Sequence, residues 1–134
     1  MAVRRKTDPA IGRAAVANWL TEQEPQAAQR PLTPADRQTL ASAVRFTLEE
    51  LADVAPGHAV EVRVAPFGAV QCIDGPKHTR GTPPNVVETD AQTWLALVTG
   101  ILGWDAAMAQ GKINASGERA DLSMWLPLQA TKRR

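Results

Sequence analysis

The residues best suited to chemistry in this sequence lie close together in the middle of the chain: Cys72, Asp74 and His78. Cys72 and Asp74 are two positions apart, so in a strand they would share a face, and His78 could fold back over them. A thiol, a carboxylate and an imidazole can bind a metal ion or activate a thiolate. Their spacing matches no recognised ligand motif, however. We favour the interpretation that Cys72 is a buried core residue, that Asp74 lies in a turn and that His78 lies in a loop.

A second candidate is the loop KHTRGTPPN, residues 77–85, where Lys77, His78 and Arg80 place several hydrogen-bond donors together. These donors could hold a carboxylate or phosphate head group. An ordinary solvent-facing connector would have the same composition, and the role of this loop stays open. The chain has two histidines and no tyrosine, and it contains neither a phosphate-binding glycine loop nor a nucleophile elbow. We therefore predict no catalytic residue, no metal and no cofactor.

Length and charge suggest one domain over residues 1–134, with short basic tails at 1–6 and 130–134. The formal net charge is +1, but six of the 15 basic residues lie in these tails, which leaves nine against 14 acids. A body with a charge of about −5 repels phosphate, so we expect no nucleic-acid binding. The single cysteine, and the absence of a signal peptide and of a long apolar run, predict a cytoplasmic protein without stable membrane insertion. The oligomeric state cannot be read from the sequence.

Two helices are predicted in the first half of the chain. Residues 7–23 carry one apolar stripe behind an N-cap candidate, which is Thr7 or Asp8. Residues 33–57 begin with a capping-box-like start at Thr33 and end at a Pro-Gly pair.

The second half mixes strands with short helices. Alternating residues in 58–74 predict a hairpin, and 86–89 predict a third strand. Capped helices are expected at 90–100 and 104–111, followed by two closing strands around a glycine turn within 112–128. Together these elements predict an α+β fold with a five-stranded, largely antiparallel sheet and helices packed on one face.

Apolar side chains are densest in WLALVTGILGWDAAMAQG, residues 94–111. The apolar surface of this stretch is wider than one helix needs to pack on a sheet, so it could serve a core, a partner or an internal cavity. The pattern alone favours a core. The residues that form its helical faces are Trp94, Leu97, Val98, Ile101, Trp104 and Met108.

From this stretch onward the sequence resembles the sterol carrier protein family, in particular its compact bacterial members. The similar segments are ETDAQTWLALVTG, GWDAAMAQGK, KINASG and ADLSMWLPL. The resemblance implies a five-stranded sheet covered by helices, with an apolar cavity between them for lipids, fatty acyl chains or sterols. It also implies that the domain has no catalytic apparatus of its own; many members of the family occur as accessory domains of enzymes.

By this resemblance the cavity would be lined by residues of both helices and of the closing strands. We predict non-enzymatic binding of a lipid-like or other hydrophobic ligand, with Arg80 or Lys77 orienting a head group. Two alternatives remain: an accessory module that holds a partner protein's helix in the same groove, and an enzyme that uses the Cys72 cluster. The implied lining residues are Trp94, Leu97, Val98, Ile101, Trp104, Met108, Ile113, Leu122, Met124 and Leu126.

Overall fold

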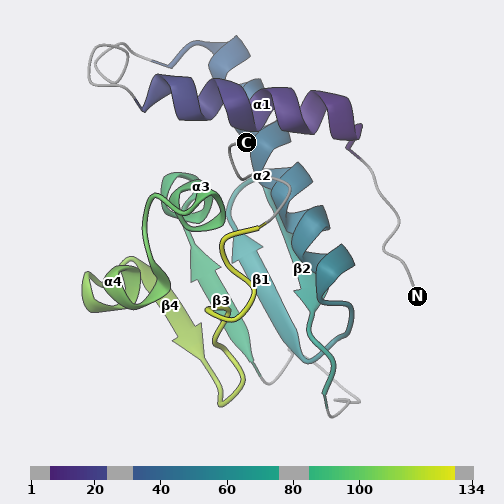
Figure 1. Cartoon of the computed structure of the whole chain (residues 1–134), viewed down its shortest axis with the longest axis vertical. Coiled ribbons are helices and arrows are strands. Elements are labelled where there is room, and N and C mark those ends of the chain that lie inside the picture. The colour runs from purple at the N-terminus through teal and green to yellow at the C-terminus, as the bar shows by residue number, and fades with distance from the viewer. Residues whose placement is uncertain (1–6, 24–31, 76–84, 129–134) are drawn as a thin grey trace.

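The computed structural model describes residues 7–23, 32–75 and 85–128 (Figure 1). Both predicted basic tails lie outside these ranges. The elements follow the predicted order as far as the last strand. They are α1 (Pro9–Glu22), α2 (Pro34–Val54), β1 (Val60–Val64), β2 (Gly68–Cys72), β3 (Val86–Thr89), α3 (Ala91–Thr99), α4 (Trp104–Ala109) and β4 (Ile113–Ser116).

The helices begin and end where local side-chain chemistry predicts. Of the two candidates at the start of α1, Asp8 is the N-cap, because its carboxylate accepts a hydrogen bond from the Ala10 backbone. Thr33 forms the predicted capping box at the start of α2. Asp90 caps α3, and Gly100 ends that helix with a φ of 87°, in the left-handed region where glycine carries no steric penalty.

The described strands form one four-stranded mixed sheet in the order β2-β1-β3-β4. The outer pairs β1–β2 and β3–β4 are antiparallel, whereas β1 and β3 are parallel. The parallel pair follows from the hairpin: β2 ends where β1 began, so the next strand enters from that end on the other side of β1. The α+β class is therefore confirmed, but the prediction of a largely antiparallel sheet is wrong at its centre.

The predicted fifth strand does not form. Residues 117–128, which we call the strap, leave β4 and cross in front of the sheet in the view of Figure 1. Its alternating apolar residues predicted a strand, but the alternation has another cause. Ala120 and Leu122 are buried, then a turn closed by the Trp125 amide and the Leu122 carbonyl rotates Met124 outward. Period-two burial here reflects a segment lying on the core rather than pairing with an edge.

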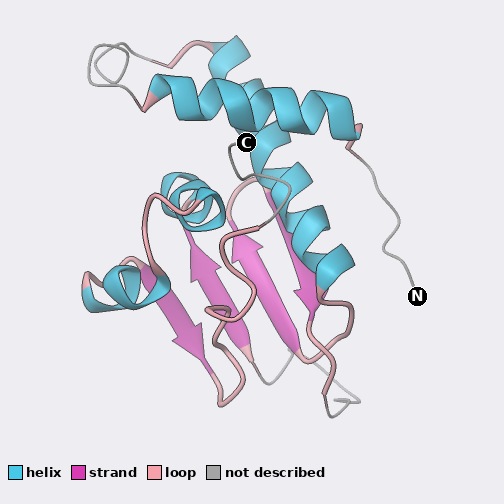
Figure 2. Ribbon diagram, in the orientation of Figure 1, coloured by secondary structure: helices cyan, strands magenta, loops and turns pink. Residues whose placement is uncertain are grey.

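One face of the sheet carries the core and the other carries charge. Helices α2 and α3 and the strap lie on one side of the sheet (Figure 2). The side chains of Val60, Val62 and Val64 are fully buried, and by strand alternation they share one face. The intervening Arg63 points to the opposite face, where its guanidinium pairs with Glu61 and, at 3.1 Å, with Glu88. Alternation of this kind is expected for a sheet with one solvated face.

Helix α1 lies across α2 at one end of the molecule (Figure 2). The close approach depends on Gly12, because a Cβ atom at that position would lie 2.2 Å from Cγ of the buried Phe46. Glycine therefore brings the two helix backbones together where any other residue would hold them apart.

Candidate functional site

Helix α3 is buried on more than one side. Trp94, Leu97 and Val98 are buried, and so is Leu95, which the helical pattern places beside that face. Two partners explain the wide apolar surface: α2 packs against α3, and the strap is tied to it by a hydrogen bond of 3.0 Å from the Leu128 amide to the Val98 carbonyl. A helix held between two apolar partners needs a broader apolar face than one that only lies on a sheet.

The indole of Trp94 is fixed from α2. Its Nε1 donates a buried hydrogen bond of 2.8 Å to Oγ1 of Thr47. That hydroxyl in turn lies 2.8 Å from the carbonyl oxygen of Ala43 and 2.9 Å from that of Val44. The polar group of Trp94 is thus satisfied within the protein, and the indole presents its apolar ring to the core.

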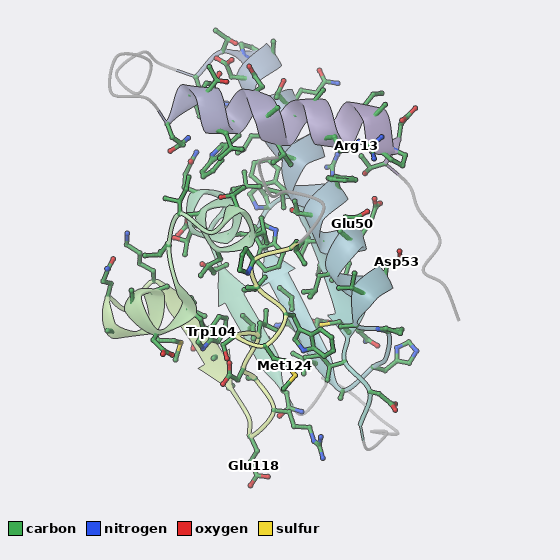
Figure 3. All side chains as sticks on the ribbon, in the orientation of Figure 1. Arg13, Glu50, Asp53, Trp104, Glu118 and Met124 are labelled. Atoms are coloured by element: carbon green, nitrogen blue, oxygen red, sulfur yellow. The ribbon has the colours of Figure 1, made fainter. Side chains whose placement is uncertain are left out.

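Several other predicted lining residues join the same core. Trp104 and Leu122 are buried, as is Ile113, and Leu126 is partly buried against them. Trp104 is the first residue of α4, and Figure 3 shows it beside β4. The helix, the last strand and the strap therefore contribute to one continuous apolar cluster.

Three predicted lining residues face solvent instead: Ile101, Met108 and Met124 are 58%, 41% and 83% exposed. Ile101 follows Gly100, whose left-handed conformation ends the helix and its periodicity. Helix α4 has only six residues and buries Trp104 and a later alanine, which leaves Met108 outward. Met124 lies on the turn of the strap, in front of the sheet in Figure 3.

The predicted polar lid lies outside the described residues, since Lys77 and Arg80 both fall in the 76–84 gap. Their contact with a ligand head group therefore stays a prediction. The same holds for the ligand-lining role assigned to the apolar residues above.

The residues proposed for thiol chemistry do not form a reactive group. Cys72 is fully buried at the end of β2, and burial raises the pKa of its thiol to about 12. At neutral pH the sulfur is protonated and is a poor nucleophile. Ile73, with a φ of 66°, breaks the strand alternation, so Asp74 is exposed instead of facing the same side as Cys72. His78 lies outside the described residues.

Within the described ranges, no group of three or more His, Cys, Asp or Glu side chains is placed to hold a metal ion. None of the helices in that part of the chain has the length and apolar character needed to cross a bilayer.

Sequence reasoning missed the structural role of the buried polar residue Asn85, which lies at the end of the predicted loop. Its Nδ2 donates to the Ala59 carbonyl at 2.8 Å, and its Oδ1 accepts from the Arg119 amide at 2.9 Å. Its backbone carbonyl also accepts from the Glu61 amide. A single side chain thus joins the starts of β1 and β3 to the start of the strap, and no local sequence signal identifies such a contact.

A pocket of about 510 Å³ opens between α1 and the first half of α2, away from α3. Its lining side chains are apolar or neutral polar, and one of them, Ile11, is exposed. The lining residues are Ile11, Ala14, Ala15, Asn18, Ala35, Gln38, Thr39 and Ser42.

Taken together, these features define an α+β protein whose candidate site is an apolar layer between helix α3, the strap and one face of a mixed sheet. The sequence matches the family described as bacterial SCP ortholog, that is, sterol carrier protein ortholog, over residues 36–128, and the chain belongs to that family. The predicted resemblance is confirmed, and the match runs from α2 to the end of the strap. Helix α1 precedes it. No curated protein matches the sequence.

Proposed function

We propose that this protein binds a lipid-like or other hydrophobic ligand, without catalysis, in the apolar layer between α3, the strap and the sheet. Membership of the sterol carrier family supports hydrophobic ligand binding in general. The observation that carries the proposal is the position of α3. Its apolar residues Trp94, Leu97 and Val98 face the interior beneath the strap, which is not part of the sheet.

The chemistry of this layer suits an alkyl or ring system better than a polar substrate. Burial of apolar surface contributes roughly 25 cal/mol per Å², which gives affinity without directional contacts. Specificity would then be loose, because alkyl groups offer few features for a site to distinguish. The candidate nucleophile Cys72 is a neutral thiol at physiological pH, which supports a binding role over an enzymatic one. Lys77 and Arg80 remain our candidates for orienting a head group.

The proposal is tested by titrating the protein with a fatty acid that carries an environment-sensitive fluorophore, alongside native mass spectrometry of the purified protein. We expect saturable fluorescence enhancement and bound acyl species. Val98→Thr replaces a methyl by a hydroxyl at a fully buried position and should weaken binding about tenfold, because the hydroxyl opposes an apolar guest. Val54→Thr makes the same change at an exposed position and should leave affinity unchanged.

Bare protein in the mass spectrum and no fluorescence change would contradict ligand binding. Equal effects of the two valine substitutions would place the ligand elsewhere, and the α1–α2 pocket would be the first alternative.

A second candidate function is that of an accessory module that binds a partner protein. The exposed side chains of Ile101 and Met124 would be the contact residues of such a module, since methionine and other apolar side chains become buried in the cores of protein–protein interfaces. A stable hetero-complex in size-exclusion chromatography, lost in the double variant Ile101→Ser/Met124→Ser and formed by protein without bound lipid, would support this function. Cytoplasmic location and the absence of nucleic-acid binding stay predictions.

A further inference from the structure

The strap is tied to the rest of the protein at its two ends. At its start the Arg119 amide donates to Oδ1 of Asn85, at 2.9 Å. At its end the Leu128 amide donates to the carbonyl of Val98, at 3.0 Å. The first tie reaches the strand entrances and the second reaches helix α3, so the strap spans the apolar layer between them (Figure 1).

Between these two ties, the hydrogen bonds of the strap are internal. The Ser123 amide donates to the carboxylate of Asp121, and the Trp125 amide donates to the Leu122 carbonyl. In the described part of the chain, residues 120–127 make no hydrogen bond to a helix or strand. A fifth strand would have been fixed by a ladder of such bonds, whereas this segment can move away without breaking any.

Buried side chains hold the middle of the strap in place. Leu122 is fully buried and Ala120 nearly so, while Met124 and Asp121 face solvent. Leu122 belongs to the same core cluster as Trp94 and Val98 of α3. The contact that keeps the strap closed is therefore apolar and non-directional, and another apolar group of similar shape can replace it.

We infer that the strap is a displaceable cover of the ligand site, and that the Leu122 side chain fills, in the free protein, the space that the ligand occupies when bound. This inference rests on the proposed function. The ligand and Leu122 compete for one apolar space, and the ties at Asn85 and Val98 keep the ends in place while the middle moves outward. The free protein is then closed and well packed, which explains how a carrier can leave its apolar layer buried without a guest.

Competition with an internal side chain lowers the apparent affinity for the ligand by the fraction of molecules in which the site is open. Shortening Leu122 removes the competitor. Leu122→Ala should therefore bind the fluorescent fatty acid about tenfold more tightly than the unaltered protein, provided that both are folded under the assay conditions.

The matched control is Leu51→Ala, which removes the same atoms from a fully buried position on α2. Like Leu122→Ala, this variant creates a cavity in the core by shortening a leucine, but it leaves the strap intact. The affinity of Leu51→Ala for the probe should therefore equal that of the unaltered protein. Circular dichroism establishes that both variants are folded before the titration. A tenfold gain shared by both variants would overturn the inference, because any core cavity would then suffice.

Hydrogen exchange gives a second readout whose sign is decisive. Displacement of the strap takes Leu122 out of the core and exposes the turn between Leu122 and Trp125 to solvent. The internal bond from the Trp125 amide to the Leu122 carbonyl then opens more often, so exchange at Trp125 should become faster when the fatty acid is added. Exchange at Val62 and Val87, paired at the centre of the sheet, should not. Slower exchange at Trp125 would mean that the ligand binds beneath a closed strap, and the inference would be wrong.

The outcomes also separate this inference from the proposed function. Binding by the unaltered protein without a gain in Leu122→Ala overturns the cover and leaves ligand binding standing. The absence of fatty-acid binding in all three proteins overturns both.

Discussion

The indole Nε1 of Trp94 donates a hydrogen bond of 2.8 Å to Oγ1 of Thr47, which lies 47 positions earlier in the sequence. Both side chains are fully buried. The bond fixes α3 against α2 and determines which way the largest side chain of α3 points. Because one face of α3 is anchored in this way, its remaining apolar residues are left to meet the sheet and the strap.

Replacing Thr47 by valine tests this anchor. The shape of the side chain is kept, but Trp94 Nε1 loses its partner in a dry site, so we expect a loss of about 2 kcal/mol in the free energy of unfolding. Urea denaturation measures the loss, and the indole proton of Trp94 should shift in the NMR spectrum. Thr99→Val is the control, because that hydroxyl only bonds the preceding turn of its own helix and should change stability little. Equal losses in both variants would show that the anchor contributes nothing specific.

Asn85 provides a second test of long-range polar contacts. Asn85→Ala removes the partners of the Ala59 carbonyl and the Arg119 amide, and we expect it to lower the free energy of unfolding by about 3 kcal/mol. The exposed Asn114 serves as the control, since Asn114→Ala should change stability by less than about 0.5 kcal/mol. If Asn85→Ala lowered the free energy of unfolding as little as Asn114→Ala, Asn85 would not join the strap to the starts of β1 and β3 as described.

The packing of α1 on α2 predicts a strong position effect for glycine. Gly12→Ala improves helix propensity by up to about 1 kcal/mol, but the new methyl group collides with buried Phe46. Because the Phe46 ring is fully buried and must shift to admit the methyl group, we expect a net destabilisation of about 2 kcal/mol by thermal or urea unfolding. Gly103→Ala is the matched control: no atom lies within 4 Å of its new Cβ, and its φ of −79° suits any residue. A stable Gly12→Ala protein would mean that α1 does not pack as described.

Burial of Cys72 predicts both its reactivity and a pH dependence. The thiol should resist alkylation at pH 8 in the folded protein and react at once in denaturant. Its pKa is about 12 in the folded state against 9.0 in the reference state, so the folded state retains the proton over that interval. Stability should therefore fall as pH rises from about 9 towards 12, by at most about 1.4 kcal/mol per pH unit from this group.

The contribution of Cys72 is isolated by comparing urea denaturation of the unaltered protein and of Cys72→Ala at each pH. The difference between the two should shrink as pH rises above 9. A constant difference would show that the folded thiol titrates normally.

The sequence predicted local structure well wherever the determining atoms lie within a few residues. Asp8, Thr33 and Asp90 start helices because their side chains cap the following backbone amides. Gly100 ends α3 because only glycine adopts its conformation freely. The alternating valines of β1 predicted a half-buried strand, and the structure has it. The family was also recognisable from short segments near the C-terminus.

The candidate site was predictable only in part, because its residues were extrapolated along helical and strand periods. That extrapolation correctly places Leu97 and Val98 in the interior, since both lie within one helix, and their contact with a ligand stays a prediction. The extrapolation is wrong for Ile101 and Met108, whose side chains are exposed. Both follow the end of α3 at Gly100, where the backbone changes direction and the helical period no longer predicts which way a side chain points. Ile73 resets it in the same way between Cys72 and Asp74.

By itself, then, the sequence determined the helices, the first four strands, the apolar character of α3 and the family, since each depends on neighbours along the chain. Three features could be seen only in the folded protein: β3 lies parallel to β1, residues 117–128 form a strap rather than a fifth strand, and Asn85 holds the start of the strap. These depend on which distant backbone groups meet. An alternating apolar pattern has the same appearance in the sequence whether its polar groups pair with a sheet edge or remain within a segment lying across the core.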